Sequence, residues 1–130
     1  MSVIEYARTV AVYVADQERA LRFFTEQLGF ELKADRPMGP DTRWIEVAPP
    51  GAQSHLVIYP RALMKDWAER KASIVFKCAD TKAAAAELEA RNVRIVMPPT
   101  DMPWGTFASF EDPDGNQFLL ADTPGAEGAG

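Results

Sequence analysis

Two side chains in the middle of the chain, Glu46 and His55, have the chemistry of a general base. His55 is the single histidine, and imidazole titrates closer to neutral pH than any other side chain. Glu46 lies in an alternating strand-like run, where a carboxylate becomes a better base if burial raises its pKa. The more common arrangements are a solvent-facing glutamate and a half-solvated histidine at a strand edge, without a role. The sequence does not show which face of the Glu46 strand is covered, so both residues remain candidate catalytic residues.

A set of aromatic and thioether side chains supplies contact surface for a flat or apolar small molecule. Aromatic rings offer large contact areas and stack on planar ligands, and methionine adapts to irregular shapes. Taken one at a time such residues are more often core or rim, but together they favour an apolar or planar ligand. The proline-rich segment 98–103 stiffens the approach to Trp104, which could overhang a binding site. The set consists of Tyr13, Trp44, Met97, Met102, Trp104 and Phe107.

Composition excludes several classes of function. A chain of 130 residues fits one compact domain. Its 14 Lys and Arg against 19 Asp and Glu give a net charge of −5, which argues against a general nucleic-acid binder and against a surface for anionic lipid. The single cysteine, Cys78, excludes an intrachain disulfide and a cysteine-based metal cluster. No apolar run is long enough for a membrane span and the first residues lack a secretory pattern, so we expect a cytoplasmic protein with no nucleic-acid and no membrane partner.

The first half of the chain predicts a strand, a helix and three more strands. Asp16 stands where a helix N-cap belongs, and apolar residues follow at helical spacing until Gly29, which can end a helix in the left-handed conformation. The segment 37–40, Pro-Met-Gly-Pro, predicts a turn. The expected strands are residues 8–15, 30–34, 43–48 and 55–59.

The same order of elements follows a linking stretch, residues 61–71. Asp80 is a second N-cap, and Asn92 occupies the place that Gly29 has in the first half. A Pro-Asp-Gly turn lies within residues 112–116, and the Gly- and Ala-rich tail 123–130 is expected to fray. The expected strands are residues 73–79, 93–97, 105–111 and 117–121.

This repetition is an internal duplication. Asp16 and Asp80 are 64 positions apart, and Gly29 and Asn92 are 63 apart. The sequence therefore predicts an α+β fold of two tandem βαβββ modules, residues 8–60 and 72–122, within one domain that spans residues 1–130. Neither module could bury its sheet face alone, so we expect the two sheets to cooperate.

Three stretches carry a family resemblance: residues 10–32, Pro103 to Gly105, and residues 110–120, which read FEDPDGNQFLL. Together they resemble the vicinal-oxygen-chelate superfamily, which includes glyoxalase I, extradiol dioxygenases and the fosfomycin- and bleomycin-resistance proteins. The resemblance runs from about residue 9 to residue 122. It implies curved mixed sheets around a concave pocket that binds a small molecule, usually with a metal ion. Many members are homodimers, so the resemblance also implies a homodimer.

The metal-dependent members of this superfamily draw four ligands of the types His, Glu or Gln from fixed strand positions. Carried onto this sequence, those positions are Thr9, Val57, Ser73 and Leu119. None of these side chains ordinarily binds a divalent ion in such a site. We therefore expect no metal and no cofactor, with Val57 and Leu119 lining the pocket instead.

The resemblance and the loss of ligands together favour a metal-independent small-molecule-binding protein of the bleomycin-resistance type, which sequesters an apolar or aromatic ligand. Whether the chain is an enzyme stays open. The alternative is a glyoxalase/lyase- or dioxygenase-like enzyme that acts on a small organic substrate, with Glu46 or His55 as general base. The candidate ligand-binding residues are Tyr13, Trp44, Val57, Trp104, Phe107 and Leu119.

Overall fold

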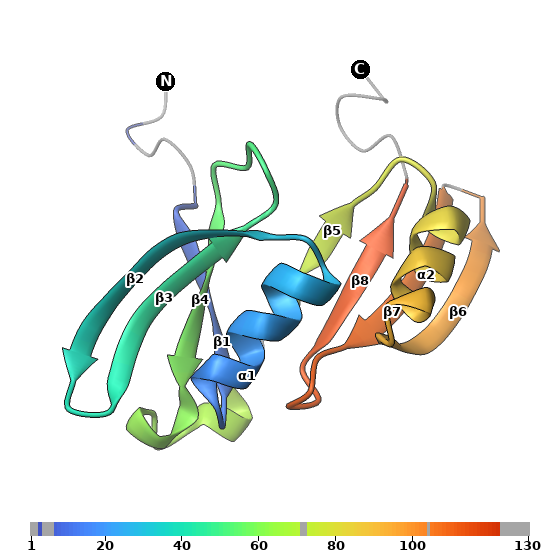
Figure 1. Ribbon diagram of the computed structural model, residues 1–130. Coiled ribbons are helices and arrows are strands. Elements are labelled where there is room, and N and C mark those ends of the chain that lie inside the picture. Colours follow the sequence, from blue (N-terminus) through green and yellow to red (C-terminus); the bar gives the residue numbers. More distant parts are fainter. Residues whose placement is uncertain (1–2, 4–6, 71–72, 104, 123–130) are drawn as a thin grey trace. The chain divides into compact units, whose positions relative to one another are not determined.

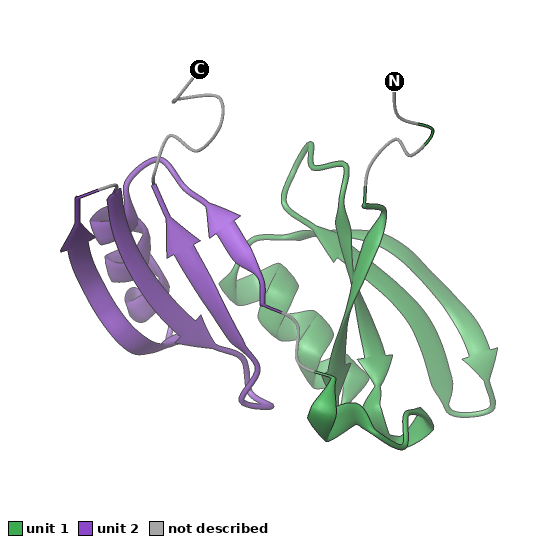
Figure 2. Ribbon diagram, turned by 180° about the vertical axis from the view of Figure 1, so that it is seen from behind, with its two compact units in different colours: residues 1–72 green, residues 73–130 purple. Residues whose placement is uncertain are grey.

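The chain forms two units, each built on its own four-stranded mixed sheet. The computed structural model describes residues 3, 7–70, 73–103 and 105–122. Figure 2 colours the two compact units, residues 1–72 and residues 73–130. The expected α+β class and the tandem βαβββ order are confirmed. Trp104 and the tail 123–130, which we expected to fray, lie outside the described residues.

Unit 1 contains the first sheet and the first helix (Figure 1). The sheet has the strand order β1-β4-β3-β2, with β1 and β4 parallel and the other neighbours antiparallel. Helix α1 (Gln17–Arg22) continues as a π-helical turn, Phe23–Gln27, and two short 3₁₀ turns, Arg61–Leu63 and Trp67–Glu69, follow the last strand. The strands are β1 (Thr9–Val14), β2 (Glu31–Gly39), β3 (Thr42–Ala48) and β4 (His55–Pro60).

Unit 2 repeats this arrangement with one helix, α2 (Thr81–Ala90). Its strand order is β5-β8-β7-β6, with β5 and β8 parallel and the other neighbours antiparallel. The strands are β5 (Val75–Lys77), β6 (Arg94–Met102), β7 (Gly105–Glu111) and β8 (Gln117–Ala121). In Figure 1 the long strands β2, β3 and β6 bend visibly along their length.

Both helices begin and end as the sequence predicts. The carboxylate of Asp16 accepts the backbone N–H of Arg19 at 3.1 Å, and Asp80 caps α2 in the same way. After the helical segments, Gly29 and Asn92 have φ of 80° and 66°, in the left-handed region. Local chemistry alone fixes these boundaries, which is why they repeat in the two units.

Two proline-containing strands are longer than the sequence predicts. The expected turn at residues 37–40 was wrong, because β2 continues through Pro37 to Gly39 and the turn follows at Pro40 and Asp41. Likewise β6 extends through Pro98 and Pro99 to Met102 instead of ending at Met97. Both are edge strands, and an edge strand tolerates proline because an outward-facing N–H has no ladder partner to lose. By contrast, β5 has only three residues where seven were expected.

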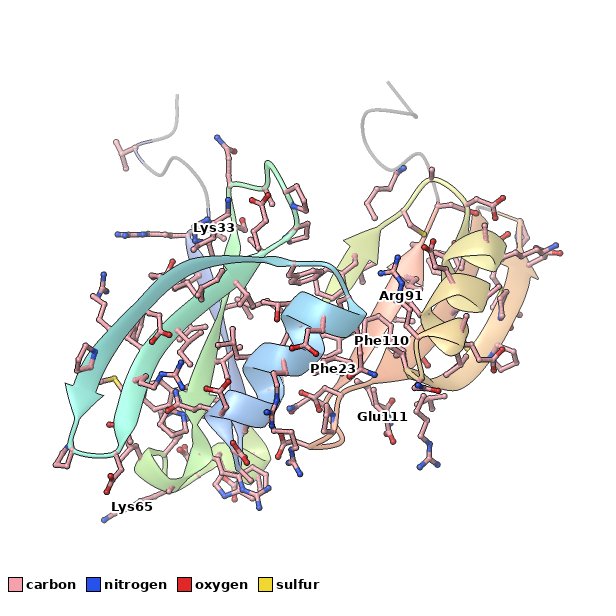
Figure 3. The ribbon with its side chains drawn as sticks, viewed as in Figure 1. Phe23, Lys33, Lys65, Arg91, Phe110 and Glu111 are labelled. Atoms are coloured by element: carbon pink, nitrogen blue, oxygen red, sulfur yellow. The ribbon has the colours of Figure 1, made fainter. Side chains whose placement is uncertain are left out.

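Each helix covers one face of its own sheet. Arg43, which shares a face of β3 with Ile45 and Val47, pairs with Glu18 of α1 at 2.9 Å, so α1 lies on that face. Ile45 and Val47 are fully buried there. In unit 2, Phe110 of β7 (Figure 3) lies opposite Ile95 of β6, which borders a shallow groove with α2.

One side chain in each unit ties the start of its helix to the sheet. The amide nitrogen of Gln17 donates to the carbonyls of Arg43 and Ile58, at 2.6 and 2.8 Å, and its oxygen accepts the N–H of Arg43. At the duplicated position, the Thr81 hydroxyl donates to the carbonyl of Thr106 at 2.8 Å. These hydrogen bonds join the first turn of each helix to strand backbone groups, so the anchors fix where each helix crosses its sheet.

Among the described residues, no helix combines the length and the apolar character that crossing a lipid bilayer requires.

The first prediction concerns this anchor. Gln17→Ala removes three hydrogen bonds to backbone groups of β3 and β4, so we expect the free energy of unfolding to fall by about 1–3 kcal/mol. Glu26→Ala, an exposed change in the π-helical turn of the same unit, is the matched control and should leave stability within about 0.5 kcal/mol. Urea unfolding followed by circular dichroism measures both. Equal midpoints for the two variants would contradict the anchor.

Candidate functional site

The face of the unit 1 sheet that α1 does not cover carries both predicted general bases. Glu46 of β3 lies opposite Val57 of β4, and Thr9 of β1 lies opposite His55. Side chains that face each other across neighbouring strands share a side of the sheet, and alternation adds every second residue. Glu46 therefore points away from α1. From β1, β3 and β4, the helix-free face of unit 1 includes Thr9, Ala11, Tyr13, Trp44, Glu46, Ala48, His55, Val57 and Tyr59.

Glu46 is a buried carboxylate that lies against two ring nitrogens. Only 6% of the residue is exposed, so the more common solvent-facing arrangement was wrong for this glutamate. One carboxylate oxygen, Oε2, accepts the indole N–H of Trp44 at 2.7 Å, and the other, Oε1, lies 2.7 Å from Nδ1 of His55. These hydrogen bonds, from Trp44 first and His55 second, hold the pKa of Glu46 below its ordinary value although burial alone would raise it. The positive charge of Arg8 acts in the same direction.

His55 is the first residue of an internal strand, not of a sheet edge. β4 lies between β1 and β3, and the backbone N–H of His55 donates to the carbonyl of Arg8 at 2.9 Å. Its side chain remains 24% exposed, so it is anchored but reachable. The expected position at a strand edge was therefore wrong, and the Glu46 carboxylate lies directly against the ring of His55.

Three aromatic rings continue from this pair along the same face. Trp44 meets Tyr59 edge to face, with ring centroids 6.4 Å apart and planes at 84°. Tyr59 meets Tyr13 in the same manner, at 5.9 Å and 86°. All three rings are half-buried. We call these five residues, His55, Glu46, Trp44, Tyr59 and Tyr13, the polar–aromatic strip.

The strip contains one residue that the sequence analysis did not select. Tyr59 links Trp44 to Tyr13, yet it was not among the candidate ligand-binding residues. Its alternation with His55 and Val57 was the available signal. Val57 lies at the centre of the face and is 2% exposed, so it is covered.

The remaining candidates belong to unit 2. Phe107 and Leu119 are half-buried and share the face of that sheet which α2 does not cover, on either side of Ser109 in the ladder. Ser109 stands opposite Leu119 as Glu46 stands opposite Val57, and its hydroxyl oxygen accepts the N–H of Met97 at 3.0 Å. Unit 2 therefore offers an aliphatic and aromatic surface where unit 1 offers a carboxylate and an imidazole. Trp104, the sixth candidate, lies outside the described residues.

The residues at the expected metal positions do not fit a divalent ion. Thr9 and Val57 lie on the helix-free face of unit 1, and Leu119 lies opposite Val75 on the corresponding face of unit 2, where Ser73 precedes the strand. Two hydroxyls and two hydrocarbon groups offer no imidazole and no carboxylate. Across the part of the chain that the structure describes, no three His, Cys, Asp or Glu residues gather into a group that could hold a metal.

Comparison with known proteins identifies a family and several relatives. A model of the glyoxalase/bleomycin resistance protein/dioxygenase superfamily matches residues 7–120. The protein YetH of Bacillus subtilis (strain 168) is 49% identical over 120 residues, which cover 92% of this chain and all of YetH.

Two solved structures share the whole fold. A member of the same superfamily from Sphaerobacter thermophilus DSM 20745 superposes with a TM-score of 0.81 at 36% identity, covering 92% of this chain and 98% of that one. TnmS3, an antibiotic-binding protein from Streptomyces sp. CB03234, superposes with a TM-score of 0.79 at 35% identity, covering 93% and 98%.

The second prediction follows from the lowered pKa of Glu46. A carboxylate whose pKa is lowered by folding stabilises the fold above its unfolded value, and this contribution is lost as the pH falls through the folded pKa. The difference in unfolding free energy between the native chain and Glu46→Gln should therefore be largest above pH 4.5, the ordinary value, and shrink below it. Denaturant unfolding at a series of pH values measures this difference.

Glu26→Gln, which changes an exposed carboxylate, is the control for this measurement. Its difference from the native chain should stay near zero at every pH. A gap for Glu46→Gln that persists undiminished to about pH 3, well below the ordinary range of a glutamate, would contradict the role of the ionised carboxylate.

Proposed function

Because the chain belongs to the glyoxalase/bleomycin resistance protein/dioxygenase superfamily, we propose that it binds a small organic molecule at the polar–aromatic strip, without a metal ion and without transforming it. The observation that carries the proposal is the buried Glu46, whose two oxygens hold Trp44 and His55 in fixed positions on a partly exposed face. The relationship to TnmS3 supports it, since that protein binds an antibiotic.

Preorganisation is the physical argument for binding. Long polar side chains lose rotamer freedom when a ligand orders them, which weakens association. Here the indole is already fixed by Glu46 and packed against Tyr59, and Tyr59 is packed against Tyr13. A flat apolar ligand therefore meets rings that need no further ordering. Each such aromatic contact contributes roughly 0.5–1.5 kcal/mol beyond the area it buries.

Metal independence rests on the donor set. The four positions that hold metal ligands in the metal-dependent members carry Thr9, Val57, Ser73 and Leu119 here, and Val57 is almost completely covered. The polar–aromatic strip supplies one carboxylate and one imidazole, and these already bind each other. Two side chains are fewer than the three protein ligands that a catalytic zinc site commonly uses.

The second candidate function is a lyase or isomerase that works without a metal, and the same pair of residues favours it. A carboxylate that fixes an imidazole is a common arrangement for a general base. Of the two predicted bases, His55 is the better one, because both oxygens of Glu46 are occupied and its pKa is lowered. In this mechanism His55 would take the proton, and Glu46 would hold the imidazole in position.

The third prediction tests the aromatic contact. Calorimetric titration with planar naphthalene- and anthracene-type compounds should detect binding, and Trp44→Ala should weaken it by about fivefold, the equivalent of roughly 1 kcal/mol. Trp67→Ala is the matched control, because Trp67 packs under the guanidinium of Arg61 in the linking segment and is not part of the strip. Equal losses for the two variants, or no binding by any compound of the panel, would reject the strip as the binding surface.

The fourth prediction concerns metal, subunits and turnover together. Native mass spectrometry of the gently purified protein should show no divalent ion, and chelation with EDTA should leave both the melting temperature and ligand affinity unchanged. The same spectrum tests the expected homodimer, and a bound organic molecule would reveal its mass. One bound divalent ion per chain would contradict metal independence and favour a metal-dependent enzyme. Recovery of the bound compound with a changed mass, abolished by His55→Ala, would favour the lyase or isomerase.

A further inference from the structure

The tautomer of His55 determines which chemical group the strip recognises. We infer that the polar contact of the ligand is a hydroxyl group carried directly on a flat ring, which donates its hydrogen to Nε2 of His55. This inference rests on the proposed binding function and names the ligand class for the same site. It follows from the donors and acceptors around Glu46.

The Glu46 carboxylate can only accept hydrogen bonds. An indole N–H can only donate, so Trp44 fixes Oε2 of Glu46 as an acceptor at 2.7 Å. The pKa of Glu46 is lowered, so the carboxylate is ionised at neutral pH and carries no hydrogen for Oε1 to donate. The 2.7 Å contact from Oε1 to Nδ1 of His55 is then a hydrogen bond only if Nδ1 bears the proton.

Nε2 of His55 is left as a hydrogen-bond acceptor. A neutral imidazole carries one hydrogen, and Nδ1 has it, so Nε2 presents a lone pair. Within the described part of the chain, the ring of His55 contacts only Glu46 by hydrogen bonding, and its side chain is 24% exposed. A ligand with a donor group can therefore complete the ring, whereas a ligand with only an acceptor faces a repelling lone pair.

Among the groups that could donate to Nε2, a hydroxyl on the ligand's ring fits the surroundings of the strip. Two arginines lie near the ends of the strip: Arg8, whose charge acts on Glu46, and Arg70, which interacts with the hydroxyl of Tyr13. Arg70 is paired with Asp66 at 2.8 Å, so it is the charge of Arg8, whose carbonyl binds the N–H of His55, that disfavours a cationic amine. Because one carboxylate bridges Trp44 and His55, the indole and the imidazole lie one carboxylate apart. A flat ligand that contacts the indole thus brings a substituent on its own ring to the imidazole, as a phenol or enol does.

The test compares two probes that differ only in this hydrogen. At about pH 8, where histidine is ordinarily neutral, 2-naphthol should bind roughly three- to tenfold more tightly than 2-methoxynaphthalene, the range expected for one hydrogen bond. The ratio of the two dissociation constants is the readout. If both probes bind with equal affinity, the hydroxyl inference is overturned and the proposed binding function survives. If neither binds, the proposed function fails with it.

Glu46→Gln should change the preference between the two probes and not only weaken the binding of both. The Gln oxygen must still accept from the donor-only Trp44, so its NH₂ group faces Nδ1 of His55 and donates to it. Nδ1 then becomes the acceptor and Nε2 carries the hydrogen, so the preference should fall to about one or reverse toward the methoxy probe. A Glu46→Gln variant that keeps the native preference would overturn the inference.

Removing the indole N–H should restore part of the native preference. In Trp44→Phe with Glu46→Gln, the amide can present either its oxygen or its NH₂ group to His55, so both tautomers of His55 become accessible and the ratio should move from the Glu46→Gln value toward the native one. Trp44→Phe alone is the matched control, in which both affinities change but their ratio does not. A double variant with the ratio of Glu46→Gln would contradict the tautomer argument.

The chain's single histidine allows a direct reading that does not depend on any probe. With ¹⁵N-labelled histidine, the two ring nitrogens give one pair of signals, and their shifts distinguish a protonated Nδ1 from a protonated Nε2. We expect Nδ1–H in the native chain, Nε2–H in Glu46→Gln and a mixture of the two tautomers in the double variant. Should the variants fail to fold, the native spectrum alone decides, since Nε2–H there overturns the inference.

Discussion

The hydrogen bonds to the Glu46 carboxylate are the constraint on which the candidate site depends. A carboxylate that is 6% exposed is unfavourable unless strong donors replace its water, and here two ring N–H groups do so, one for each oxygen. The same two bonds fix the orientation of the indole and the protonation of the imidazole. The indole and the imidazole that stabilise the buried Glu46 carboxylate are therefore the same groups that the proposed ligand would contact.

The two duplicated units differ in this chemistry because they carry different residues at the position of Glu46. Both units use the same local devices, an aspartate at the start of the helix and a side chain after it that binds strand carbonyls. At the position of Glu46, however, unit 2 has Ser109, whose oxygen accepts the N–H of Met97 where β6 is irregular. The Ser109 hydroxyl oxygen therefore binds a backbone group of its own sheet, and the residue supplies no carboxylate. The two units thus have similar backbones, and unit 1 carries the Glu46–His55 pair.

Much of the fold could be predicted from the sequence because its signals are local. Asp16 and Asp80 cap the helices, Gly29 and Asn92 end them, and alternation identified the strands. The errors arose where the position of a strand in the sheet overrides local preference. Pro37 ends a strand in most contexts but is tolerated here because β2 is an edge.

The site could be predicted only in part, because its geometry depends on register between strands that are distant in sequence. Glu46 and His55 were recognised as chemically capable, but nothing local states that β3 and β4 pair so that Glu46 faces Val57, which places the carboxylate one step from the imidazole. A shift of one residue would turn Glu46 toward α1 and leave His55 without its partner. Tyr59 was missed for the same reason, since its role appears only once Trp44 lies beside it. In such a sheet the residues supply the chemistry, and the pairing register determines which of them act together.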